Sequence, residues 1–140
     1  MYIPFVLLPV FVQVALMFAV LGVLFARRNA AFRKGDIAFT DIALGQHVWP
    51  ADAQQAANSW RNQFELPVLF FALVPLAIIT HKADLQFVLF SWAFVILRVA
   101  HAIVHLTFND VRARGPLFGL GAIVLFLMWV ILAVRILAAL

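Results

Sequence analysis

Four long runs of apolar residues constrain this chain more than any other feature. They alternate with short polar segments, and 66% of the 140 residues are hydrophobic while only 11% are charged. A soluble domain is about half apolar and about a quarter charged, whereas a helix that crosses a bilayer needs about 20 predominantly apolar residues. We therefore predict an all-α integral membrane protein with one domain, a four-helix bundle of up-down-up-down topology. The four helices are expected at about residues 2–26, 53–80, 84–108 and 116–139.

Most basic residues lie in the segments between the apolar runs, which indicates a role in membrane orientation. Segments 27–52 and 109–115 together hold six Lys and Arg residues, whereas the turn before the third helix holds only Lys82. The positive-inside rule places both segments in the cytoplasm and both termini on the other side of a bacterial-type inner (plasma) membrane. Arg112 and Arg114 are expected to act as orientation charges. This distribution argues against nucleic-acid binding despite the net charge of +4.

The chain contains no cysteine. This excludes disulfides, thiolate metal sites and a cysteine nucleophile, so any thiol chemistry must use a thiol that arrives with a ligand. His101 and His105 lie one helical turn apart and could bind metal or haem. Haem ligands usually come from facing helices, however, and His81 falls at the opposite side of the membrane, so we expect no metal site.

Two charged residues fall deep inside the expected helices. They are Glu65 on the second helix and Arg98 on the third. A charge at the centre of a spanning helix costs about 2.5–3.5 kcal/mol on insertion scales, and buried charges are normally paired. Because a tight turn joins the two helices, we expect them to be antiparallel neighbours and predict that Glu65 and Arg98 are direct partners.

Helical spacing places further polar residues beside this pair. On the second helix the polar positions are i, i+3, i+4 and i+7, and on the third they are i, i+3 and i+7, so each set occupies one face. These residues are Asn58, Arg61, Asn62 and Glu65, and Arg98, His101 and His105. At about 1.5 Å per residue, Glu65 and Arg98 both lie about 15–16 Å from the cytoplasmic helix ends. We predict a polar cleft that opens to the cytoplasm. Pro67 either kinks the helix and widens this cleft or is one of the prolines common in spanning helices.

Three stretches of the sequence resemble the MAPEG family, the membrane-associated proteins of eicosanoid and glutathione metabolism. They are "FARRNAAFR" with Arg27 and Arg28, "RNQFELP" with Asn62, Glu65 and Pro67, and "LRVAHAIVH" with Arg98 and His101. They are similar, in order, to the basic end of the family's first helix, the Asn-x-x-Glu signature of its second and the Arg-x-x-His stretch of its third. Members are four-helix membrane proteins of about this length, so the resemblance covers nearly the whole chain.

The resemblance implies a bacterial member that forms a homotrimer and binds glutathione as co-substrate in cytoplasm-facing clefts between subunits. An arginine of the family stabilises the glutathione thiolate, which attacks small apolar electrophiles arriving through membrane lipid or reduces lipid hydroperoxides. Carried onto this chain, the resemblance implies Arg98 and His105 as catalytic residues. The implied glutathione-binding residues are Arg27, Arg28, Asn58, Arg61, Asn62, Glu65 and His101.

Departures from the family pattern keep other functions open. His105 stands where the family has a tyrosine, and the spacing from Glu65 to Pro67 is one residue shorter than in better-known members. A non-catalytic lipid- or thiol-binding protein on the same scaffold is therefore the alternative. A small multidrug-type transporter is a third hypothesis, although the membrane carboxylate of that class is expected in the first helix.

Overall fold

The chain folds into a bundle of long helices, and the computed structural model describes residues 2–45 and 48–139. The helices are α1 (Ile3–Lys34), α2 (Phe39–Ile42), α3 (Ala51–Asn62), α4 (Leu66–Ile79), α5 (Leu85–Leu106) and α6 (Val111–Leu137). No strand occurs within these described ranges. Four helical stretches are long and apolar enough to cross a membrane, with α3 and α4 together forming the second. The predicted all-α architecture with four membrane helices is confirmed.

The first helix extends to Lys34, whereas the sequence predicted an end near Ala26. The apolar run ends there, but the residues that follow continue the helix, and the first strong stop signal is Gly35. Gly35 adopts a left-handed conformation with φ of 75°, and the N–H groups of Gly35 and Asp36 donate to the carbonyls of Phe32 and Ala31. Such a glycine cap commonly ends a helix. Segment 27–52 is therefore partly helical rather than one loop.

The second membrane helix is broken between Asn62 and Leu66, where a continuous helix was expected. Pro67 has no N–H to donate to the carbonyl of Gln63, and its ring crowds that carbonyl. The N–H groups of the three residues after Asn62 instead bond to carbonyls three residues back, in a tighter turn. Of the two interpretations of Pro67, the structure thus favours the kink, in the stronger form of a complete break.

The last helix begins at Val111, about one turn before the predicted start at Pro116. The carboxylate of Asp110 accepts a hydrogen bond of 2.9 Å from the N–H of Arg112 and caps the helix. Aspartate is among the preferred residues at this position. Pro116 therefore lies inside α6. The third helix ends at Leu106, within two residues of its predicted end.

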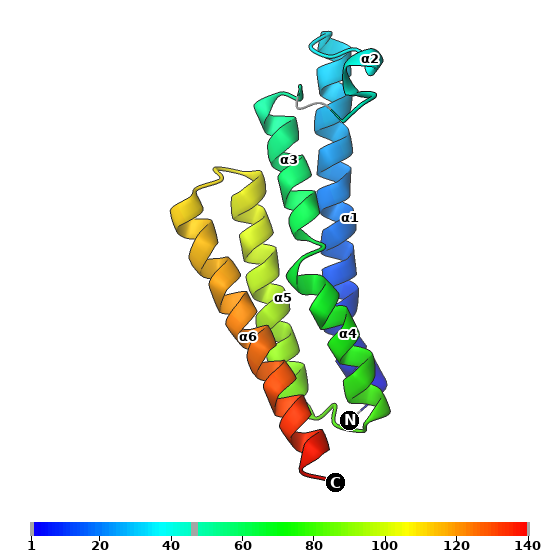
Figure 1. The fold of residues 1–140 in the computed structure, drawn as a ribbon, viewed down its shortest axis with the longest axis vertical. Coiled ribbons are helices and arrows are strands. Elements are labelled where there is room, and N and C mark those ends of the chain that lie inside the picture. The colour runs from blue at the N-terminus through cyan, green and yellow to red at the C-terminus, as the bar shows by residue number, and fades with distance from the viewer. Residues whose placement is uncertain (1, 46–47, 140) are drawn as a thin grey trace.

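The break in the second membrane helix changes which helices its two halves contact. α3 packs against α1 and α5, whereas α4 packs against α1 and α6. In Figure 1, α5 and α6 form a hairpin beside the other helices, and both chain ends lie at the lower end. The apolar core is in the lower half of the bundle and includes Phe70 and Phe94, whose ring centroids are 5.0 Å apart.

A buried pair of glutamines joins α1 to the broken helix. Gln13 and Gln63 are both fully buried, and Nε2 of Gln13 donates to Oε1 of Gln63 at 3.2 Å. Nε2 of Gln63 lies 3.4 Å from the carbonyl oxygen of Ser59. Buried polar groups are costly unless they are hydrogen-bonded. This pair therefore fixes the end of α3 against α1 at the point where the helix breaks.

Candidate functional site

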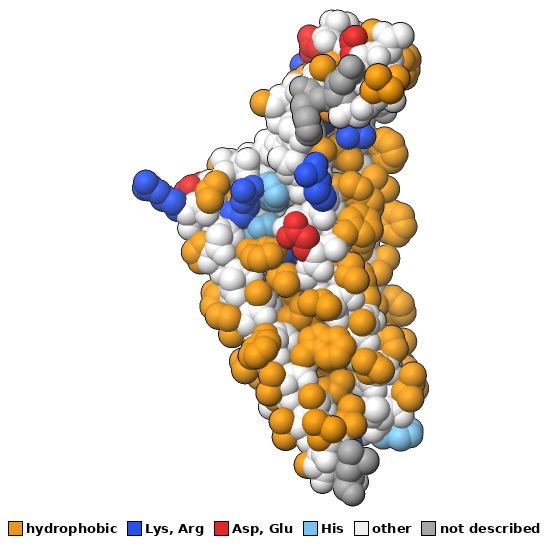
Figure 2. All heavy atoms as spheres, in the orientation of Figure 1, with side chains coloured by type: hydrophobic (Ala, Val, Ile, Leu, Met, Phe, Trp, Pro, Cys, Tyr) orange, Lys and Arg blue, Asp and Glu red, His pale blue; other side chains and the backbone are white. Residues whose placement is uncertain are grey.

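A polar cavity of about 550 Å³ lies between α3 and the α5–α6 pair. It is lined by Asn58, Arg61, Asn62, Glu65, His101, His105, Val111, Arg114, Gly115 and Phe118. Figure 2 shows acidic, basic and histidine side chains gathered around this hollow, above a surface that is almost entirely hydrophobic. Six of the nine site residues predicted from the sequence therefore line one cavity.

Asn62 links the two charged residues that the sequence singled out. Its Nδ2 donates to Oε2 of Glu65 at 2.8 Å, and its Oδ1 accepts from Nη2 of Arg98. The backbone carbonyl of Asn62 also accepts from the same Nη2 at 3.3 Å. The amide of Asn62 thus bridges a carboxylate and a guanidinium.

The predicted direct pairing of Glu65 with Arg98 is wrong. Among the residues that the structure describes, the one Arg–carboxylate ion pair is between Arg135 and Asp84. The helix break explains the difference, because it turns Glu65 outward, where it is exposed, while Arg98 is only 1% exposed. Asn62, on the last turn of α3, occupies the space between them.

Arg98 lies behind the cavity wall rather than in its lining. Its Nε and Nη1 atoms are buried and have no hydrogen-bond partner among the described residues. Its Cζ lies 6.0 Å from the ring centroid of Phe118, which does line the cavity. A guanidinium has five donors in a planar fork. Arg98 therefore keeps unused donors next to a cavity wall made by Phe118, Asn62 and His101.

The two histidines of α5 stand one turn apart on the cavity wall. Their ring centroids are 5.5 Å apart, and the His101 ring lies 5.8 Å from that of Phe118. Their Nδ1 atoms are buried without a hydrogen-bond partner within residues 2–45 and 48–139. The backbone of His105 is fixed, because its carbonyl accepts a 2.7 Å bond from Nε2 of Gln55. No three His, Asp or Glu side chains gather as a metal site in the described part of the chain.

Arg27 and Arg28, predicted as ligand-binding residues, are absent from the cavity lining. Arg27 donates from Nη1 to the carbonyl of Asp52 at 2.9 Å and from Nη2 to the carbonyl of Leu106 at 2.6 Å. It therefore holds the start of α3 and the end of α5 against α1. The guanidinium of Arg28 lies 4.5 Å from the ring centroid of Trp49, a cation–π contact.

Sequence reasoning missed the contribution of α6 to the cavity. Val111, Arg114, Gly115 and Phe118 all line it, and their spacing of i, i+3, i+4 and i+7 is that of one helix face. This pattern was not recognised because the helix was expected to begin only at Pro116. Nη1 of Arg114 donates to Oδ1 of Asn109 at 2.6 Å, which orients the guanidinium.

An apolar groove continues from the polar cavity along α4 and α6. It measures about 370 Å³ and is lined by Leu66, Leu69, Ala122, Leu125, Phe126 and Trp129. Leu66 directly follows Glu65, and Ala122 lies one turn after Phe118, so the two hollows adjoin. The two hollows share no lining residue, so a polar cavity and a separate apolar groove lie next to each other.

The cavity combines cations with a single carboxylate. Arg61, Arg114 and the neighbouring Arg98 supply three guanidiniums, and Glu65 is the one acidic residue in the lining among the residues that the structure describes. Arginine forks bind carboxylates through two hydrogen bonds, and a carboxylate suits an ammonium group. The arrangement fits a small ligand that carries more than one anionic group and one cationic group.

Comparison with known proteins agrees with the resemblance seen in the motifs. The sequence model of the MAPEG family matches residues 6–134, which is most of the chain. Neither the comparison with curated proteins nor that with solved structures gave a match.

Proposed function

The chain belongs to the MAPEG family, and from this premise we propose that it binds glutathione, or a related thiol, in the polar cavity between α3 and the α5–α6 pair. The bound thiol would then conjugate apolar electrophiles or reduce lipid hydroperoxides. The observation that carries the proposal is the chain of contacts from Glu65 through Asn62 to Arg98. It connects a carboxylate in the lining of the cavity to a guanidinium directly behind the cavity wall.

The charges of glutathione match this wall. The tripeptide has two carboxylates, one ammonium group and one thiol. Arg61 and Arg114 would bind the carboxylates bidentately, and Glu65 would accept from the ammonium group. The volume of about 550 Å³ falls within the range of about 300–1,000 Å³ usual for small-molecule sites.

The proposal assigns the catalytic roles to Arg98 and His105. A thiol reacts as its thiolate, and the positive charge of Arg98, directly behind the cavity wall, would stabilise that anion. In conjugation by substitution, the thiol proton passes to His105 or to water, the sulfur forms a bond to the electrophilic carbon, and the leaving group departs with the electron pair of the broken carbon bond. The apolar groove between α4 and α6 would hold the electrophile, with its reactive end at the polar cavity.

The exposed charges of the cavity support association with a second copy of the chain, and the family resemblance makes the proposed assembly a homotrimer. Arg61 and Glu65 are both exposed on the bundle surface, and a charge facing lipid is costly. A second copy of the chain that covers this side would enclose both residues and complete the binding site. We propose that the cavity faces the cytoplasm of a bacterial-type inner membrane, as the positive-inside rule indicates.

Calorimetry of glutathione binding to the purified, detergent-solubilised protein tests the proposal. We expect saturable binding that Glu65→Gln weakens strongly, because the neutral amide loses the charge that pairs with the ammonium group. Asp36→Asn, which removes an exposed carboxylate outside the cavity lining, is the matched control and should bind normally. Absence of binding in the folded protein, or equal binding by Glu65→Gln, would reject the proposed site.

The second candidate is a non-catalytic lipid- or thiol-binding protein. It is favoured by His105, which replaces the tyrosine of the family pattern and so removes a phenol donor. Turnover of chlorodinitrobenzene or a lipid hydroperoxide well above background would exclude it. Glutathione binding without turnover would support it.

A further inference from the structure

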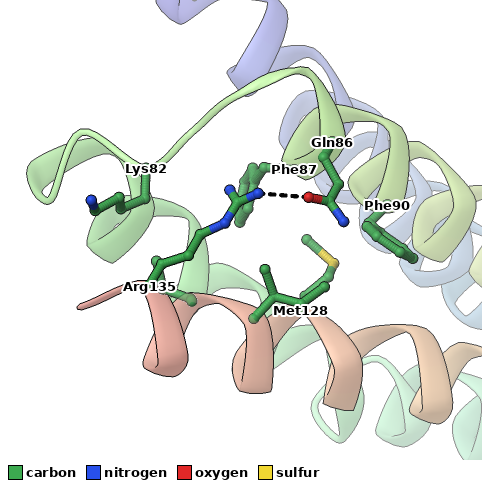
Figure 3. A pocket seen from close by; sticks show the side chains of 8 residues that line it. Lys82, Gln86, Phe87, Phe90, Met128 and Arg135 are labelled. Atoms are coloured by element: carbon green, nitrogen blue, oxygen red, sulfur yellow. Dashed lines mark hydrogen bonds between the residues drawn. The ribbon is translucent and has the colours of Figure 1, made fainter. Parts of the chain in front are cut away.

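The end of the bundle opposite the polar cavity carries an isolated pair of basic residues. Of the ten Lys and Arg residues in the chain, Lys82 and Arg135 are the two found near this end. Nη1 of Arg135 lies 2.7 Å from Oδ2 of Asp84, and its Nη2 donates to Oε1 of Gln86 at 2.6 Å. In Figure 3 the Arg135 guanidinium reaches toward Gln86, while the Lys82 ammonium points outward beyond it.

Two hollows meet at these basic residues. One, of about 480 Å³, is lined by His81, Lys82, Asp84, Arg135, Ala138 and Ala139. The other is a narrow crevice between α5 and α6, lined by Lys82, Gln86, Phe87, Phe90, Met128, Ile131, Leu132 and Arg135. Lys82 and Arg135 belong to both. The crevice measures only about 10 Å³, so the polar hollow is the part of this region that can receive a ligand group.

The local charge balance is positive. The carboxylate of Asp84 is already engaged, since it accepts from the N–H of Phe87 at 3.0 Å and pairs with Arg135. The ammonium group of Lys82 has no hydrogen-bond or ion-pair partner among the described residues. Among the Lys, Arg, Asp and Glu side chains that the structure describes at this hollow, two cations and one carboxylate leave one net positive charge.

We propose that this region is a binding site for one anionic phospholipid. The phosphate lies in the polar hollow and contacts Lys82 and the outer edge of Arg135, while the acyl chains extend along the apolar outer surface of the spanning helices. Asp84 and Gln86 orient Arg135 for this contact. A free phosphate would use only the polar hollow, whereas a phospholipid also packs its acyl chains against the apolar surface of the spanning helices.

Lipid binding to the purified full-length protein tests this proposal. The probes are phosphatidylglycerol and phosphatidylcholine with identical acyl chains, counted by native mass spectrometry from detergent. We expect Lys82→Gln to weaken phosphatidylglycerol binding about fivefold, since a basic residue near an anionic lipid contributes about that factor. Lys34→Gln, which removes a lysine at the opposite end of the bundle, should leave the affinity unchanged.

Two further outcomes bear on the occupant. Equal binding of phosphatidylcholine and phosphatidylglycerol, or unchanged phosphatidylglycerol binding by Lys82→Gln, would overturn the proposal. Glycerol phosphate, which has the same anionic group without acyl chains, should fail to displace the lipid at equal concentration. Effective displacement by glycerol phosphate would identify a site for soluble phosphate and would equally overturn it.

Discussion

Replacing Asn62 by alanine should destabilise the protein through Arg98 rather than through Asn62 itself. Arg98 is 1% exposed, and Asn62 is its hydrogen-bond partner through both a side-chain and a backbone oxygen. Asn62→Ala removes the side-chain acceptor and leaves the carbonyl at 3.3 Å. A hydrogen bond to a charged group contributes about 1.5–3 kcal/mol. We expect a loss of about 2–3 kcal/mol in unfolding free energy. This is less than the roughly 3–5 kcal/mol lost when a buried charge keeps no partner at all.

A double-mutant cycle separates this effect from a simple loss of packing. Arg98→Met removes the charge that needs a partner, so the further change Asn62→Ala should then cost much less. The two substitutions should show a coupling energy of about 2 kcal/mol, as expected for residues in one hydrogen-bond network. Asn58→Ala is the control: Asn58 is on the same face of α3 but is exposed and bonded only to Gln54, so the change in stability should be at most about 0.5 kcal/mol.

The assay is reversible unfolding in mixed micelles of dodecyl maltoside and sodium dodecyl sulfate, followed by circular dichroism. Unfolding free energies of the wild type, both single variants and the double variant give the coupling directly. Additive effects of the two substitutions would show that Asn62 and Arg98 act independently. That result would refute the role of Asn62 as the residue that connects Glu65 to Arg98 at the cavity wall.

Three other perturbations have defined outcomes. Gln63→Leu leaves the buried Gln13 amide without its partner and should lower the unfolding free energy by about 1–3 kcal/mol in the same assay. The double change Gln13→Leu/Gln63→Leu should recover most of this loss. An equal loss in the single and the double variant would contradict the pairing. Pro67→Ala restores an N–H at the helix break, so spin labels at positions 61 and 68 should approach the spacing of a continuous helix in electron-resonance distance measurements, and an unchanged distance would show that Pro67 does not cause the break. Partial burial opposes ionisation of Asp84, but the Phe87 N–H and the Arg135 guanidinium together hold its pKa below the ordinary value. The ion pair of Asp84 should therefore stabilise the protein above the unfolded-state pKa of about 4 and lose this effect as pH falls through the lower folded-state pKa. The stabilisation should be at most about 1 kcal/mol, because both side chains are partly exposed. Asp84→Asn should abolish this part of the pH dependence of unfolding.

The number of membrane helices was predictable because hydropathy depends only on composition along the chain. Helix ends were less predictable, because they depend on single capping residues. Gly35 and Asp110 set the end of α1 and the start of α6, and neither position coincides with the edge of an apolar run. The sequence therefore predicted the membrane segments well. It predicted poorly where the helices end beyond those segments.

The candidate site was predictable where helical spacing determines it. The polar face of α3 and the histidines of α5 follow from the period of the helix, and they line one cavity. The pairing of Glu65 with Arg98 was not predictable, because matching depths along two ideal helices ignore the break that turns Glu65 outward. Gln63 was likewise not recognised as a partner of Gln13, since the two residues lie 50 positions apart.

The unequal lengths of the helices give the cavity an uneven rim. α1 has 32 residues and α5 has 22, so at about 1.5 Å per residue α1 is about 15 Å longer. In Figure 1 the upper end of α1, with α2 beside it, rises well above the turn between α5 and α6. The hydrocarbon layer is about 30 Å thick, so the upper part of α1 extends beyond it into water. A ligand dissolved in water would therefore approach the cavity over the shorter side, at the α5–α6 turn of residues 107–110. The longer α1 shields the cavity on the opposite side.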